Sequence, residues 1–109
     1  MIVKDKLVSD ALAYLAQDPH PIAVARKAVV DAENAAKLSY ASAFLDAEGS
    51  VGAREATATC DGDYHLAKGV ESDAILDLER HRARVKAAEM IIEVWRSENA
   101  NARAAERVR

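Results

Sequence analysis

A run of basic side chains in the last third of the chain is the feature best able to do chemistry. Between positions 80 and 86, every second residue is basic. On a helix, Arg80 and Arg84 lie one turn apart, and so do Arg82 and Lys86. Such ladders can follow a phosphate backbone, because each neutralised phosphate releases counterions. The sequence predicts the following nucleic-acid-binding residues: Arg54, Lys68, Arg80, Arg82, Arg84, Lys86, Arg96 and Arg103.

The basic residues and the single tryptophan each have a second interpretation. The arginines can instead face solvent and pair at helical spacing with Asp77, Glu79 and Glu89. Trp95, beside Arg96, could offer a nucleobase a flat surface. Trp95 also lies on an apolar stripe, where packing against another helix is the more common role.

Other reactive residues do not form a known catalytic or metal-binding pattern. Cys60 and His65 lie near Asp61 and Asp63, but structural zinc sites use four Cys or His ligands in paired spacing. A single cysteine also excludes an internal disulfide. We find no Gly-rich phosphate loop and no serine in a nucleophile elbow. We therefore expect no enzyme activity, no catalytic residues, no metal and no cofactor.

The stretch from Glu71 to Arg109 lacks Gly and Pro and must position the basic residues. Its apolar seam recurs in steps of three and four, as on one face of a helix. The seam is Leu78, His81, Val85, Ala88, Ile92, Trp95, Asn99 and Ala102. Such a helix would be roughly 55 Å long, so we expect part of it to pack on another long helix or another chain. The predicted oligomer interface is Tyr40, Phe44, Leu78, His81, Val85, Ile92, Trp95 and Asn99.

Composition favours an all-α fold. Half of the 109 residues are apolar, aromatics are only 5%, and alanine, the best helix former, is very common. We expect one domain, 1–109, forming an elongated helical hairpin or small bundle that oligomerises like a coiled coil. Its expected parts are an N-terminal helix and Pro turn (1–20), a second helix (21–48), a short helix (50–60) and a long C-terminal helix (63–107). The alternative is one continuous helix from Ser50 onward.

Charge is unevenly distributed along the chain. Residues 1–78 carry 7 basic and 13 acidic side chains, net −6, and residues 79–109 carry 8 basic and 5 acidic, net +3. This asymmetry suits head-to-tail self-association or an anion-binding tail. The N-terminus does not read as a signal peptide, and no apolar run approaches the roughly 20 residues of a membrane span. We expect a cytoplasmic protein with no membrane contact.

Three segments resemble phage recombination-mediator proteins of the UvsY type. The segments are Asn34–Tyr40 continuing through Ala43-Phe44-Leu45, then Ser50–Glu55, and the helix from Glu71 through Trp95 to Arg103. The resemblance covers about residues 30–103 and is one of spacing rather than a shared signature. It implies a small helical phage protein that forms a ring-like or other homo-oligomer in the host cytoplasm. It also implies binding of single-stranded DNA and help in loading a recombinase onto strands coated by single-strand-binding protein.

One segment departs from this family. In UvsY-type proteins, the DNA-contacting part is a Lys/Arg-rich helix before an Asp-Gly turn. In this chain the corresponding residues, 54–60, contain a single basic side chain, Arg54. A DNA-binding role would therefore shift to Arg80–Lys86, weaken, or be absent. The second hypothesis is a helical inhibitor or adaptor that uses the acidic face of residues 46–77 to bind a host or phage protein.

Overall fold

The computed structural model describes residues 3–108, and within that range it contains helices and no strand. The helices are α1 (Asp5–Leu15), α2 (Pro21–Asp46), α3 (Val51–Thr59) and α4 (Gly62–Val108). Each lies inside its expected range, except that α4 is one residue longer at either end. The predicted all-α fold with a long C-terminal helix is confirmed. None of the helices in the described range has a stretch long and apolar enough to cross a membrane.

Two short turns interrupt the helices on either side of α3. Gly49 has a φ of 107°, a conformation that suits glycine. Ser50 then caps α3, because its hydroxyl accepts a hydrogen bond from the Ala53 N–H at 3.2 Å. Asp61 caps α4 in the same way by accepting from the Tyr64 N–H at 3.0 Å. The alternative of one continuous helix from Ser50 is therefore wrong, because the Asp61 carboxylate starts a new helix.

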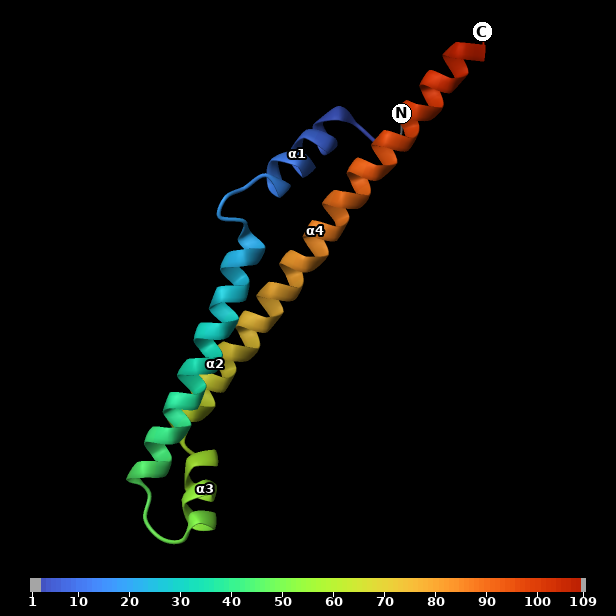
Figure 1. Cartoon of the computed structure of the whole chain (residues 1–109). Coiled ribbons are helices and arrows are strands. Elements are labelled where there is room, and N and C mark those ends of the chain that lie inside the picture. Colours follow the sequence, from blue (N-terminus) through green and yellow to red (C-terminus); the bar gives the residue numbers. More distant parts are fainter. Residues whose placement is uncertain (1–2, 109) are drawn as a thin grey trace. The chain divides into compact units, whose positions relative to one another are not determined.

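The chain divides into two compact units, Met1–Pro21 with Arg80–Arg109, and Ile22–Glu79. We call them the terminal unit and the middle unit. Figure 1 shows α2 and α3 with the first part of α4 in the middle unit, and α1 beside the later part of α4 in the terminal unit.

The middle unit packs through small side chains. Ala25, Ala32 and Ala36 of α2 are buried, and so is Leu78 of α4. On α4 the less exposed residues recur at 64, 67, 71, 74 and 78, in steps of three and four. Alanine at the contact lets two helices approach closely. The inner face of this hairpin is therefore narrow, and larger apolar residues of α2, such as Leu38 and Leu45, are exposed.

The terminal unit packs α1 on α4 through a small core. Ala11 and Tyr14 of α1 meet Ala88 of α4, and Val85, Ile92 and other partly buried residues surround them. At the start of α1 the Val3 N–H donates to the Glu98 carboxylate at 3.4 Å. The seam residues Val85, Ala88 and Ile92 are thus covered by α1 of the same chain.

Candidate functional site

Tyr14 is the centre of a polar cluster in the terminal unit. Its side chain is only 4% exposed, and its hydroxyl lies 3.1 Å from Nδ1 of His81. The hydroxyl donates when that nitrogen carries no proton and accepts when it does. His20 meets the Tyr14 ring edge-on at 4.9 Å, and the guanidinium of Arg84 lies 4.2 Å above it. The polar interruption of the seam at His81 is therefore used to fix α1.

The basic residues of α4 divide between two sides of the helix. Neighbours two apart in sequence, such as Arg82 and Arg84, are rotated by about 200° around a helix. Arg80 and Arg84 therefore share one side, and Arg84 is held there by Tyr14. Arg82 and Lys86 lie on the other side, toward which Arg96 and Arg103 also turn. We call these four residues, Arg82, Lys86, Arg96 and Arg103, the open basic side; all four are exposed.

Of the four cations on the open basic side, Arg82 interacts with other residues of the chain, whereas the other three form no ion pair among residues 3–108. Arg82, Asp77 and Glu79 each take part in an interaction within the chain. No ion pair of Lys86, Arg96 or Arg103 occurs among residues 3–108. Glu89 and Glu93 lie between these cations in sequence and dilute their charge. The C-terminal part of the open basic side is therefore the part best able to bind an anion.

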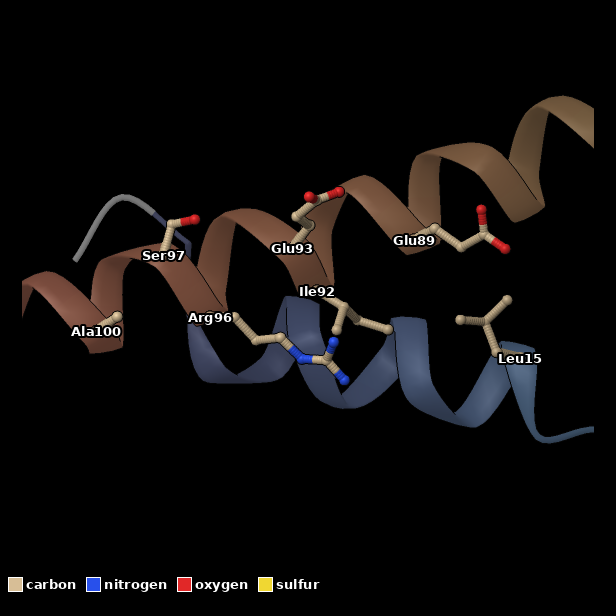
Figure 2. Close-up of a pocket in the computed structure, with 7 residues that line it drawn as sticks. All are labelled: Leu15, Glu89, Ile92, Glu93, Arg96, Ser97 and Ala100. Carbon is tan, nitrogen blue, oxygen red and sulfur yellow. The ribbon is translucent and has the colours of Figure 1, made fainter.

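Trp95 lies next to these cations in an open groove. It is half-buried, and the groove is lined by Trp95, Arg96, Asn99, Ala102, Arg103 and Glu106. Arg96 also borders a second hollow, where Figure 2 shows it reaching from α4 toward α1, with Ile92 and Leu15 further along. An aromatic ring beside two arginines can stack on a base while the arginines bind phosphates.

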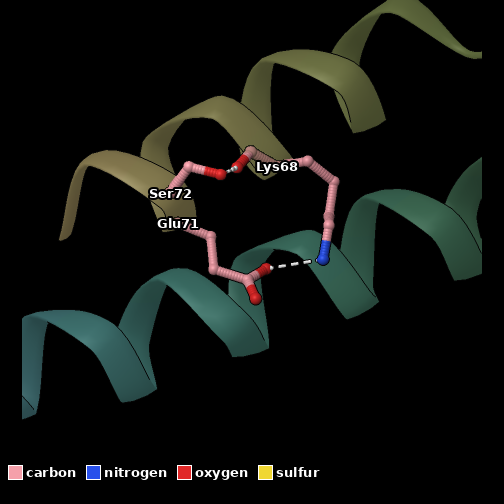
Figure 3. Close-up of polar contacts among 3 residues, drawn as sticks. All are labelled: Lys68, Glu71 and Ser72. Carbon is pink, nitrogen blue, oxygen red and sulfur yellow. Dashed lines mark hydrogen bonds and ion pairs between the residues drawn. The ribbon is translucent and has the colours of Figure 1, made fainter. Parts of the chain in front are cut away.

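The two remaining predicted cations lie in the middle unit and have local partners. Arg54 is half-buried, and its Nε donates to the Gly49 carbonyl at 3.2 Å, which fixes the turn before α3. Lys68 pairs with Glu71 at 3.1 Å, and Figure 3 shows the two side chains meeting beside α2. This hydrogen bond raises the pKa of the Lys68 amine above its ordinary value. Neither residue belongs to the open basic side.

A second groove in the middle unit contains an aromatic pair that the sequence analysis missed. Tyr40 and Tyr64 meet at 5.3 Å with their rings nearly perpendicular. The groove is lined by Glu33, Ala36, Lys37, Tyr40, Tyr64, Lys68 and Glu71. The signal was available, because Tyr64 and Glu71 extend the spacing of the seam toward the N-terminus at steps of seven. Two carboxylates and two amines balance each other here, so this groove has little net charge.

Most of the predicted oligomer interface lies against the chain's own helices. Leu78 is 7% exposed, Val85 and Ile92 pack on the core of the terminal unit, and His81 bonds to Tyr14. Tyr40 and Phe44 are half-buried in the middle unit. We expected part of the seam to pack on another long helix or another chain, and α1 and α2 of the same chain cover most of it. The oligomer interface stays a prediction. Trp95 and Asn99, which are half-buried, remain partly open.

Reactive side chains do not converge in the described part of the chain. Cys60 is exposed, and no three His, Cys, Asp or Glu residues among 3–108 approach closely enough to hold a metal ion. No protein-family model matches the chain, and comparison with curated proteins and with solved structures finds no match either.

Proposed function

We propose that this protein binds single-stranded DNA through the open basic side of α4. The observation that carries the proposal is Trp95, half-buried in a groove that Arg96 and Arg103 also line. Base–aromatic stacking contributes about 1–3 kcal/mol per base and tolerates any sequence. The flanking arginines add phosphate contacts, which also carry no sequence information. Residues 80–109 hold 8 basic and 4 acidic side chains, so the field around the groove favours an anion.

The biological role follows from the resemblance to UvsY-type mediators. A homo-oligomer of this chain would hold several such grooves, and one strand could then bind to many of them, which raises the overall affinity. We propose that the protein assists recombinase loading on strands covered by single-strand-binding protein, in the cytoplasm of a phage-infected cell. Arg54 and Lys68 take no part in this proposal, because both are engaged with their own unit.

The test uses the intrinsic fluorescence of Trp95, the sole tryptophan. Titration with an oligothymidine should change its emission, and affinity should fall as salt rises, with a slope of about −0.7 per phosphate contacted. Arg96→Ala with Arg103→Ala should weaken binding roughly tenfold and reduce the slope by about 1.4, because two contacts are lost.

The matched control is Arg26→Ala with Lys27→Ala, which removes the same charge from exposed positions of α2. It should leave the slope unchanged, since neither residue lines the groove of Trp95. Binding should be strongest at low ionic strength, because salt screens the attraction between charges. Absence of binding at roughly 20–50 mM salt would therefore refute the proposal. Equal weakening by both double variants would show that only net charge matters, and would refute the groove as the site.

A protein-binding adaptor is the second candidate, and the charge of the middle unit favours it. Residues 22–79 carry 11 acidic and 5 basic side chains. Exposed Leu66 and Val70 lie among these carboxylates on α4. An acidic surface with apolar residues fits a basic protein partner. Capture of one specific protein that survives nuclease treatment, without any binding of oligothymidine, would favour this function over the first.

A further inference from the structure

The groove of Trp95 contains polar groups besides its two arginines. Four of its lining residues follow one another along α4 in steps of four, three and four, so they share one face of the helix. We call them the groove row: Trp95, Asn99, Ala102 and Glu106. Arg96 and Arg103 each come one residue after a member of this row, and a rotation of about 100° turns both to the same side. The row therefore presents an aromatic ring, an amide and a carboxylate, with two cations along one edge.

Asn99 and Glu106 are available to bind a ligand. Neither the Asn99 amide nor the Glu106 carboxylate has a hydrogen-bond or ion-pair partner among residues 3–108. Asn99 is half-buried and Glu106 is exposed. They are about 10 Å apart along the helix axis, and the residue of the row between them is Ala102, whose side chain is a single methyl group. The edge of a flat base can therefore approach both polar groups.

A carboxylate in this groove is suited to the bases of a strand and not to its backbone. The Glu106 carboxylate accepts hydrogen bonds and repels phosphates, which carry the same charge. The four bases differ in what their unpaired edges donate to it. Guanine has N1–H and N2–H2 side by side and can donate to both carboxylate oxygens. Adenine and cytosine each have one amino group. Thymine has only N3–H, between two carbonyl oxygens that repel a carboxylate.

We infer that the groove binds guanine in preference to thymine, and that Glu106 and Asn99 set this preference. Glu106 accepts from N1–H and N2–H2 of guanine, and such hydrogen bonds to an ionised acceptor are stronger than neutral ones. The side-chain N–H2 of Asn99 donates to the neighbouring O6. Stacking on Trp95 and phosphate contacts of the arginines add affinity for any base. The inference rests on the proposed function, because it concerns the same groove.

The test is competition against a labelled oligothymidine, followed by fluorescence anisotropy. The two competitors have equal length: an oligothymidine, and the same strand with every third thymidine replaced by deoxyguanosine, which keeps the guanines apart. The wild-type protein should bind the guanine-containing strand about fivefold tighter or more, the lower end for one bidentate base contact. Replacing guanine with hypoxanthine, which lacks the N2 amine, should remove most of this difference.

Substitutions assign the preference to residues. Glu106→Gln replaces one acceptor oxygen with an N–H2 group and should abolish most of the guanine preference without weakening oligothymidine binding. Asn99→Ala should reduce the preference in part, because the contact to O6 is lost. The matched control is Glu93→Gln, which removes the same charge from an exposed position of α4 that does not line this groove. It should keep the full preference.

The outcomes separate this inference from the proposed function. Equal binding of both competitors by the wild-type protein would overturn the inference and leave the DNA-binding proposal intact. Absence of binding to either strand would refute both. A guanine preference that survives Glu106→Gln must come from other residues, and an equal loss of preference in Glu106→Gln and Glu93→Gln would show that only net charge matters. Each of these two results would overturn the assignment to the groove row.

Discussion

Removing the hydroxyl of Tyr14 tests how the terminal unit is held together. Tyr14→Phe keeps the ring that packs on Ala88 and lies under Arg84, and removes only the oxygen 3.1 Å from Nδ1 of His81. The Tyr14 side chain is almost fully buried, so water cannot easily take the place of the lost group. His81 is half-buried and keeps a further interaction within the chain, and this limits the stability lost when the Tyr14 hydroxyl is removed.

We expect Tyr14→Phe to lower the free energy of unfolding by about 1 kcal/mol, the net contribution of one intramolecular hydrogen bond. For a chain of this length, that corresponds to a midpoint lower by about 4 °C. Tyr14→Ala should cost far more, about 3–5 kcal/mol, because it also removes the largest side chain of a small core.

The assay is urea unfolding followed by Trp95 fluorescence, because Trp95 belongs to the same unit as Tyr14. Circular dichroism followed in parallel reports both units, and two separate transitions would show that they unfold independently. Tyr40→Phe is the control, since no hydrogen bond of the Tyr40 hydroxyl is found in the described residues. If the two tyrosine-to-phenylalanine variants are equally stable, the His81 contact contributes nothing and the reasoning fails.

Two further substitutions probe α4 itself, with stability measured in the same way. Gly69→Ala should stabilise the protein by about 0.5–1 kcal/mol, because Gly69 is inside the helix and a methyl group there meets no atom within 4 Å; unchanged stability would show that the helix is already frayed at this point. Asp61→Ala should destabilise it by about 1 kcal/mol, because the cap on the Tyr64 N–H is lost. Asp63→Ala, which removes only a charge in the first turn, should cost less, and an equal cost would argue against capping.

Helix positions followed from local rules in the sequence. Pro21 is the first residue of α2, as its fixed backbone angle predicts, and Gly49 and Ser50 separate α2 from α3. The three-four spacing of the seam predicted the inward side of α4, and Leu78 and Ala88 are buried there. These features depend on residues a few positions apart, and for that reason they can be recognised in one chain.

The partners of each face could not be predicted in this way. Tyr14 and His81 are 67 positions apart, and neither residue specifies the other. For the seam residues of the C-terminal stretch, the sequence left open whether another long helix or another chain covers them. In the structure, α1 covers Val85, Ala88 and Ile92 with a few well-placed side chains. Periodicity identifies a surface that must be covered, but it does not identify what covers it.

The basic residues of the candidate site also could not be assigned to a common surface from the sequence alone. In sequence, Arg80 to Lys86 reads as one basic ladder, yet a rotation of about 100° per residue divides it between two sides of α4. One side holds Arg84 against Tyr14 and adjoins Ala87 and Ile91 in a partly apolar groove. The other continues toward Arg96 and Arg103 beside Trp95. A ligand lying along α4 meets only one of these sides at a time. The proposed DNA binding therefore uses only the second side, and Arg84 takes no part in it.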